Sequence, residues 1–175
     1  ILRKIEKLCC LYRACTRIPA LTQITFQHWI IKLNFSPSTV GWIDADQFKW
    51  HITTRSDLQR IHPENAERID AIRDGIIQCG LDSKLACIQA PPAELSFITA
   101  IHSPTYVQHV EQLCHHGGGR LDEDDTSVVP ASWVTLLHAA GAAVKAVQYV
   151  QQGHWKRAFC SVRPPGHHAL ADQAM

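Results

Sequence analysis

Two adjacent histidines near the C-terminal end of the sequence, His167 and His168, are the residues whose types and spacing best suit chemistry. An imidazole exchanges a proton near neutral pH, so two neighbouring imidazoles can act as a general base and a general acid. The stretch before them, Arg163–Gly166, holds two prolines that stiffen the backbone and a glycine that permits a tight turn and close approach to a substrate. The alternative is a pair of ordinary surface histidines in a loop.

The elements that precede this loop must position the two histidines. The apolar run Ala158–Val162 predicts a buried strand that leads directly into the loop. Apolar periodicity, capping residues and glycine or proline stops predict five further elements upstream. In chain order these are a helix that begins at Pro63 and stops at Gly80, a strand at Leu85–Gln89, a short helix at Glu94–Ala100, a helix that starts at Ser103-Pro104 and ends at Gly117, and a long helix at Pro130–Gln152, with Ser132 as its N-cap.

This order of elements indicates the fold class. Helices that alternate with short, fully apolar strands are typical of an α/β fold with a parallel sheet. In such sheets, ligands bind beyond the carboxyl ends of the strands. Because His167 and His168 follow the strand Ala158–Val162, they are expected at that position.

Residues 1–50 give a weaker pattern than the rest of the chain. The segment Ile1–Cys15 has apolar residues at helical spacing, whereas Thr16–Trp50 carries prolines, a glycine and scattered aromatic residues without a clear element. The sequence therefore predicts an N-terminal segment of unclear structure at residues 1–50 and a folded part at residues 51–175.

Composition and charge limit the class of protein. Of the 175 residues, 46% are apolar and 19% are charged, and 17 basic against 16 acidic residues give a net charge of +1. This balance offers no electrostatic footprint for nucleic acid or for an anionic membrane, and no apolar stretch reaches the roughly 18 residues of a membrane span. The seven cysteines contain no CxxC pair. With no secretory signal pattern either, a reducing, cytoplasmic compartment is expected.

Three collinear stretches resemble one known family. Residues 163–169, Arg-Pro-Pro-Gly-His-His-Ala, resemble the signature of the histone deacetylase and acetylpolyamine amidohydrolase family. Residues 62–68 resemble the HPE-x-x-ER helix start of that family, and residues 101–107 resemble its vHs-x-x-Yv segment. The acidic stretch before Thr126 and the following Ser132-Trp133 resemble the bacterial or class II branch. The resemblance covers about His62 to Met175.

The resemblance implies a fold and a function. The fold would be part of the three-layer α/β/α arginase-deacetylase type, truncated at the C-terminus, with residues 51–175 as the N-terminal part of the domain and residues 1–50 outside the family's pattern. The function implied is that of a fragment of a zinc-dependent deacetylase that hydrolyses acetyl-lysine or acetylpolyamine. The implied partner is the acetylated substrate, with no nucleic acid or membrane.

The resemblance also implies roles for individual residues. In the family, a zinc ion held by two aspartates and a histidine polarises the acetyl-amide carbonyl and activates a water. His168 would be the general base and then the acid that protonates the leaving amine, and His167 would give electrostatic support. Asp125 would pin the substrate backbone, although the adjacent Asp124 leaves the register open by one residue and a solvated acidic loop is the alternative.

The sequence departs from the family pattern in one essential respect. The family's zinc ligands lie in a later Asp-x-His motif and a further aspartate, and its transition-state tyrosine comes later still; none of them is in this sequence. No metal ligand is therefore assigned, and the chain alone is expected to lack zinc and deacetylase activity. The alternative function is a catalytically inactive truncated or pseudogene product.

Overall fold

The computed structural model describes residues 39–52, 64–121 and 126–174. All of them belong to one compact unit that begins at Phe35. The expected helix at Ile1–Cys15 and the residues His62 and Asp125 lie outside the described residues. In the part of the chain that is described, no helix is long and apolar enough to cross a membrane.

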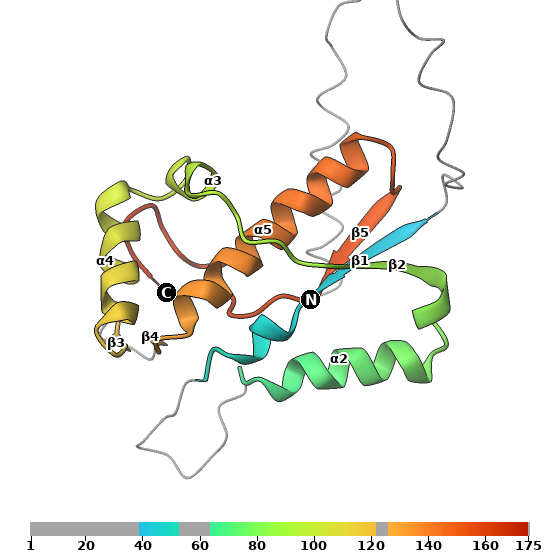
Figure 1. The fold of residues 1–175 in the computed structure, drawn as a ribbon, viewed down its shortest axis with the longest axis horizontal. Coiled ribbons are helices and arrows are strands. Elements are labelled where there is room, and N and C mark those ends of the chain that lie inside the picture. The colour runs from blue at the N-terminus through green and yellow to red at the C-terminus, as the bar shows by residue number, and fades with distance from the viewer. Residues whose placement is uncertain (1–38, 53–63, 122–125, 175) are drawn as a thin grey trace, which may run out of the picture. The chain divides into compact units, whose positions relative to one another are not determined.

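A three-stranded parallel sheet forms the centre of the described unit (Figure 1). Strand β1 (Val40–Asp44) lies between β2 (Leu85–Gln89) and β5 (Arg157–Cys160). In register, Ile43 of β1 lies opposite Ile88 of β2 and Cys160 of β5. The predicted α/β class with a parallel sheet is confirmed, and β2 has the bounds that the sequence predicted.

Strand β1 corrects the expectation that residues 1–50 have no clear structure. Residues 40–49 contain this strand and the 3-10 helix η2 (Asp46–Lys49), so the expectation is wrong for them. The local signal is weak because β1 is short and contains a glycine and a terminal aspartate, which are both depleted in strands. Gly41 is nevertheless needed, since a Cβ at this position would overlap the ring of Trp155. Only the contact with a residue far along the chain explains the glycine.

The helices follow the predicted order. They are α2 (Glu67–Gln78), α3 (Leu95–Thr99), α4 (Pro104–His115) and α5 (Ser132–Gln151), with a short 3-10 helix, η3 (Asp82–Lys84), before β2. Ser103 caps α4 as predicted, because its side chain accepts a hydrogen bond from the backbone N–H of Tyr106 at 3.2 Å. The predicted N-cap of α5 is wrong: the cap is Ala131, and Ser132 lies in the first turn.

The longest helix, α5, covers one face of the sheet. Gly141 of α5 sits against the backbone of Pro91 and Ala93, where any side chain would collide. Ala142 and Ala146 are buried in the same interface, so small residues let the helix approach closely, as the sequence predicted. The buried residues of the resulting core are Ile43, Ala45, Phe48, Ile69, Ala90, Ala142, Ala146 and Trp155.

A small hairpin follows α4. Strands β3 (Gly119–Arg120) and β4 (Ser127–Val128) pair antiparallel. Gly117 and Gly118 end α4 with φ angles of +107° and +89°, a backbone region that favours glycine. The hairpin returns the chain to the start of α5.

Candidate active site

The carboxyl ends of β1 and β5 carry a buried polar network. Ser161, directly after β5, donates a hydrogen bond from Oγ to Oδ1 of Asp44 at 2.9 Å and accepts one from Nε1 of Trp42 at 3.0 Å. Asp44 also accepts from Nε of Arg73 on α2 at 2.6 Å. The network therefore joins the strand ends to α2 at the edge of the sheet where a parallel sheet binds its ligands.

Arg163 is the largest fully buried side chain at this edge, with 1% of its surface exposed. Its Nε and Nη2 atoms donate to the two carboxylate oxygens of Glu64 at 2.6 and 3.0 Å. Its Nη1 donates to the backbone carbonyl of Phe48 at 2.9 Å. A two-pronged pair of this kind fixes the plane of the guanidinium as well as its position, which a lysine could not do.

His51 lies in the same buried region. Its Nδ1 is 2.7 Å from Oγ of Ser132, and this hydroxyl also accepts a hydrogen bond from the backbone N–H of Val129 at 2.9 Å. Burial, reinforced by the positive charge of Arg163 and opposed by Glu64, lowers the pKa of His51 from 6.5 to about 4. The imidazole is therefore neutral near pH 7. Ser132 is 0% exposed, so this serine–histidine pair is closed to any substrate.

The two predicted catalytic histidines lie beyond the carboxyl end of β5. Both side chains are exposed, and their ring centroids are 4.2 Å apart with planes inclined at 50°. Gly166 does not need a glycine conformation, because its φ lies outside the positive region, and a Cβ there would meet no atom within 4 Å. Neither the backbone conformation nor a lack of space therefore requires a glycine at this position. The expected tight turn is not the reason for it, and the space beside Gly166 is open.

The loop that bears the histidines returns to the start of α4. The backbone N–H of Ser103 donates to the carbonyl of Ala171 at 2.7 Å, and Nδ1 of His102 donates to the carbonyl of Leu170 at 2.8 Å. In Figure 1 the chain leaves β5, passes α5 and ends beside α4. An open hollow of about 370 Å³ lies at this junction, lined by Ser103, Thr105, Tyr106, His109 and Asp172.

Metal ligands are not gathered anywhere in the part of the chain that the structure describes. Among residues 39–52, 64–121 and 126–174, no three side chains of histidine, cysteine, aspartate or glutamate lie close enough together to hold a metal ion. These residues do not fit a zinc site of the family's type, which needs three protein ligands. His115 and His116 do not form one either: they end α4, where Nδ1 of His116 donates to the carbonyl of Gln112 at 2.7 Å.

The sequence alone did not identify the groups that support the loop of His167 and His168, called the histidine loop from here on. Glu64 lies in residues 62–68 and Arg163 in residues 163–169, two of the stretches that resemble the family. The motifs therefore marked both residues, although they did not show that the two are paired. His51 left none, since a single histidine after an unpatterned segment has no periodicity to mark it. Asp125 lies outside the described residues, so its role in binding substrate stays a prediction.

Comparison with known proteins identifies the family that this chain matches. The Histone deacetylase domain matches residues 62–175. A histone deacetylase-like amidohydrolase of Pseudomonas aeruginosa is 34% identical over 135 residues, which cover 77% of this chain and 32% of that protein. A polyamine deacetylase of Mus musculus is 33% identical over 111 residues, covering 61% of this chain and 17% of that protein.

The matches cover only part of the length of each relative. A probable deacetylase of Archaeoglobus fulgidus is 31% identical over 110 residues, or 62% of this chain and 30% of that protein. The chain thus spans about a third of the length of several of the curated relatives that it matches.

A solved structure supports the fold. The HD domain of HDA15 superposes with a TM-score of 0.74 at 23% identity, over 80% of this chain and 39% of that one. This likeness confirms the expected arginase-deacetylase α/β fold. Because the Histone deacetylase domain accounts for residues 62–175 of the 175, the chain belongs to the histone deacetylase family.

Proposed function

We propose that this chain supplies the acid–base part of a deacetylase that hydrolyses the acetyl-amide bond of acetyl-lysine or acetylpolyamine. The observation that carries the proposal is the exposed pair His167 and His168, with rings 4.2 Å apart, beyond the carboxyl end of a parallel strand in a histone deacetylase domain. Both imidazoles are accessible to a substrate, in contrast to the buried His51.

The chemistry assigned to the chain is a two-stage proton transfer. His168 accepts a proton from a water whose oxygen attacks the acetyl carbonyl carbon, and the C–O bond forms as the carbonyl π electrons move onto oxygen. The oxyanion then re-forms the C=O bond as the C–N bond breaks, and His168 returns the proton to the leaving nitrogen, so that acetic acid and an amine result; transfer of the acid proton to the amine gives acetate and an ammonium ion. The imidazole of His167 stabilises the positive charge that His168 acquires when it takes up the proton. Asp125 is proposed to hold the substrate backbone.

Zinc belongs to the proposal only through the family resemblance. In that family the ion polarises the carbonyl and activates the water. Since the described residues of this chain do not assemble three ligands, no step of the proton transfer is assigned to a metal.

The substrate class rests on the relatives. One is named an amidohydrolase and another a polyamine deacetylase, so both names refer to the cleavage of an acyl-nitrogen bond. A catalytically inactive role for the chain itself is the second candidate.

A graft tests the proposal. In the graft, residues 35–175 replace the matching third of the Pseudomonas aeruginosa amidohydrolase, and the rest of that protein is left unchanged. The expected result is chelator-sensitive release of acetate from an acetyl-lysine peptide or from acetylspermidine. A folded, zinc-loaded graft that hydrolyses neither substrate would contradict the proposal.

The chain without any graft separates the two candidates. We expect the purified 175-residue chain to release no acetate from either substrate with zinc added. Chelator-sensitive hydrolysis by the chain alone would show that it holds its own metal ligands, and the inactive role would then be wrong.

We also propose a reducing, cytoplasmic compartment. The four cysteines within the described residues, Cys79, Cys87, Cys114 and Cys160, are free thiols. Burial raises the pKa of Cys160 on β5 to about 11, so this thiol is unreactive and packs as a small apolar residue.

A further inference from the structure

We infer that Arg163, clamped by Glu64, is a positioning residue that sets where the imidazoles of His167 and His168 lie. This inference rests on the proposed function, because it concerns the same histidine pair. Among the residues that the structure describes, the side chain of Arg163 donates its hydrogen bonds to Glu64 and to the carbonyl of Phe48, and none reaches either imidazole. Arg163 and Glu64 act through the short stretch of backbone between Arg163 and His167.

The connection between Arg163 and His167 is short and stiff. Only Pro164, Pro165 and Gly166 separate the two residues, and each proline holds its own φ near roughly −65°. The two prolines transmit a displacement of Arg163 along the backbone, and a hydrogen bond from the N–H of Ala169 to the carbonyl of Gly166 at 3.1 Å restrains the glycine that follows them. Within the part of the chain that the structure describes, neither imidazole has a hydrogen bond of its own, so among these residues it is the backbone that sets where they lie.

Arg163 is held by groups from several separate elements. Glu64, before α2, binds both prongs of the guanidinium, and the Phe48 carbonyl of η2 binds the third nitrogen. The helix η2 is in turn held to α5, because Oγ1 of Thr135 donates to the carbonyl of Gln47 at 2.9 Å. Neutral His51 fills the space beside this pair and is bound to α5 through Ser132.

The other end of the loop has its own anchor. His102 and Ser103, at the start of α4, donate to the carbonyls of Leu170 and Ala171. The histidine pair is thus held between two fixed points. This explains why three stretches far apart in sequence occur together: residues 62–68 and 101–107 provide the partners for the two ends of the loop that residues 163–169 begin.

A purely structural ion pair is the competing explanation, and nuclear magnetic resonance of the 175-residue chain separates the two. Arg163→Lys keeps the charge and loses the two-pronged geometry. We expect the ring-proton shifts of His167 and His168 to lose the contribution that each ring makes to the other. We also expect hydrogen exchange at the amides of Ala169 and Leu170 to become at least about tenfold faster.

The matched control is Arg73→Lys. Arg73 also donates to two carboxylates, those of Asp44 and Asp46, but Arg73 itself lies on α2 and not in the segment that leads into His167 and His168. We expect its exchange rates at Ala169 and Leu170 to stay within about threefold of the parent chain. Equal effects from Arg73→Lys and Arg163→Lys would overturn the inference in favour of a general loss of stability.

A second variant, Glu64→Gln, keeps the inference testable if Arg163→Lys does not fold. Glu64→Gln keeps the side-chain volume and one oxygen acceptor, and it should reproduce the shifts of Arg163→Lys. The double variant should add little to the larger single effect, because the two residues act as one unit. Unchanged histidine shifts in a folded Glu64→Gln chain would overturn the inference.

The positioning role can be tested independently of catalysis. If the graft with the Pseudomonas aeruginosa protein proves inactive while Arg163→Lys and Glu64→Gln still move the histidine rings, the proposed function fails and the positioning role stands. If the graft is active while both variants leave the histidine rings unmoved, the proposed function stands and the positioning role fails.

Discussion

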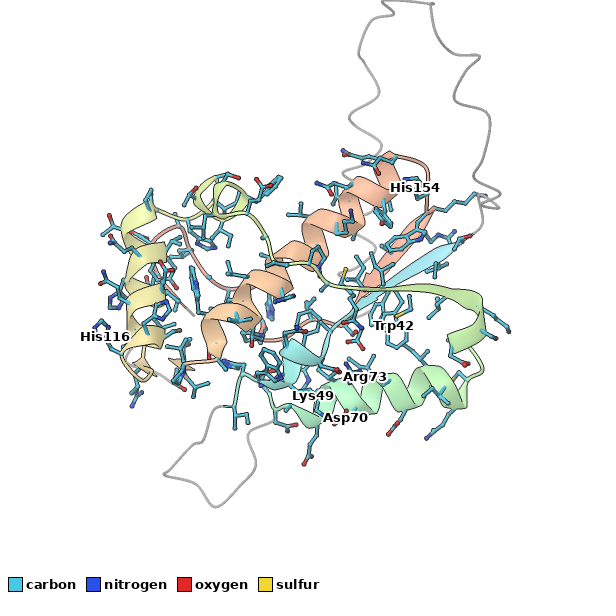
Figure 2. The ribbon with its side chains drawn as sticks, viewed as in Figure 1. Trp42, Lys49, Asp70, Arg73, His116 and His154 are labelled. Carbon is cyan, nitrogen blue, oxygen red and sulfur yellow. The ribbon has the colours of Figure 1, made fainter. Side chains whose placement is uncertain are left out.

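Two pairs of adjacent histidines in this chain, His115-His116 and His167-His168, have the same residue types but lie in different structural settings. The first pair ends a helix, where His116 donates to a carbonyl of the preceding turn and His115 lies 3.9 Å from Glu111. Figure 2 shows His116 at the end of α4, away from Trp42 on the sheet. The second pair follows a parallel strand, with its imidazoles exposed and its backbone held at both ends.

The difference teaches that a histidine pair becomes a candidate for catalysis through what holds it. A helix C-terminus uses histidine to satisfy free carbonyls and to complement the helix dipole. At the end of a parallel strand the same residues face the region where ligands bind, and their side chains make no structural hydrogen bond among the described residues. The two pairs are therefore distinguished by their supports, and changes to those supports should affect them differently.

The largest expected difference is in catalysis. In the graft with the Pseudomonas aeruginosa protein, His168→Ala should lower kcat by roughly 100- to 10,000-fold, the range of a lost acid–base group. His116→Ala should leave kcat within about twofold, because His116 only caps α4. Steady-state kinetics on acetyl-lysine peptide measures both. Similar losses from the two variants would remove the distinction between the pairs.

The support of the second pair should be costly to remove. Glu64→Leu leaves the charge of Arg163 buried without a carboxylate to neutralise it, and we expect the free energy of unfolding to fall by roughly 3 to 5 kcal/mol. Asp70→Asn is the control, since the side chains of Asp70 and its partner Lys49 are 46% and 37% exposed and their pair should matter by less than about 1 kcal/mol. Figure 2 shows Lys49, Asp70 and Arg73 where η2 approaches α2. Urea unfolding provides the comparison, and equal losses would contradict it.

Acid should weaken the same support through His51. In the unfolded chain His51 takes up its proton around pH 6.5, whereas the folded chain resists protonation down to a pKa of about 4. The unfolded state binds more protons between these values, so the free energy of unfolding falls as the pH drops from 6.5 to 4, by up to about 3 kcal/mol. Urea unfolding at several pH values should show a shallower slope for His51→Gln. His116→Gln, at the exposed first pair, should keep the parent slope; a change as large as that of His51→Gln would refute the assignment.

The glycines beside the two pairs should give the smallest effect. Gly117→Ala forces a side chain into a φ of +107° and should cost roughly 1 to 2 kcal/mol, because the end of α4 needs that conformation. Gly166→Ala should change the stability by less than about 0.5 kcal/mol, since its Cβ meets nothing within 4 Å and its φ is not positive. Thermal unfolding distinguishes them, and a larger loss for Gly166→Ala would reverse the expectation.

The sequence predicted most of the framework and only part of the site. Long periodic helices such as α5 and the apolar strand β2 could be predicted locally, because burial of one face imposes a pattern on neighbouring residues. Strand β1 could not, since the need for Gly41 comes from Trp155, over a hundred residues away in the chain. His51 and its altered pKa were beyond prediction for the same reason: the groups that bind it and shift its pKa come from three other parts of the chain.

By itself, the sequence determined the fold class, the order of the elements, the family resemblance and the place of His167 and His168 after a strand. These depend on local periodicity, caps and short motifs, which are written in consecutive residues. Only the tertiary structure decided that Arg163 meets Glu64, that His51 is buried and neutral, and that Leu170 returns to His102. Desolvation and hydrogen bonding between distant residues exist only once the chain has folded, so no local pattern could show them.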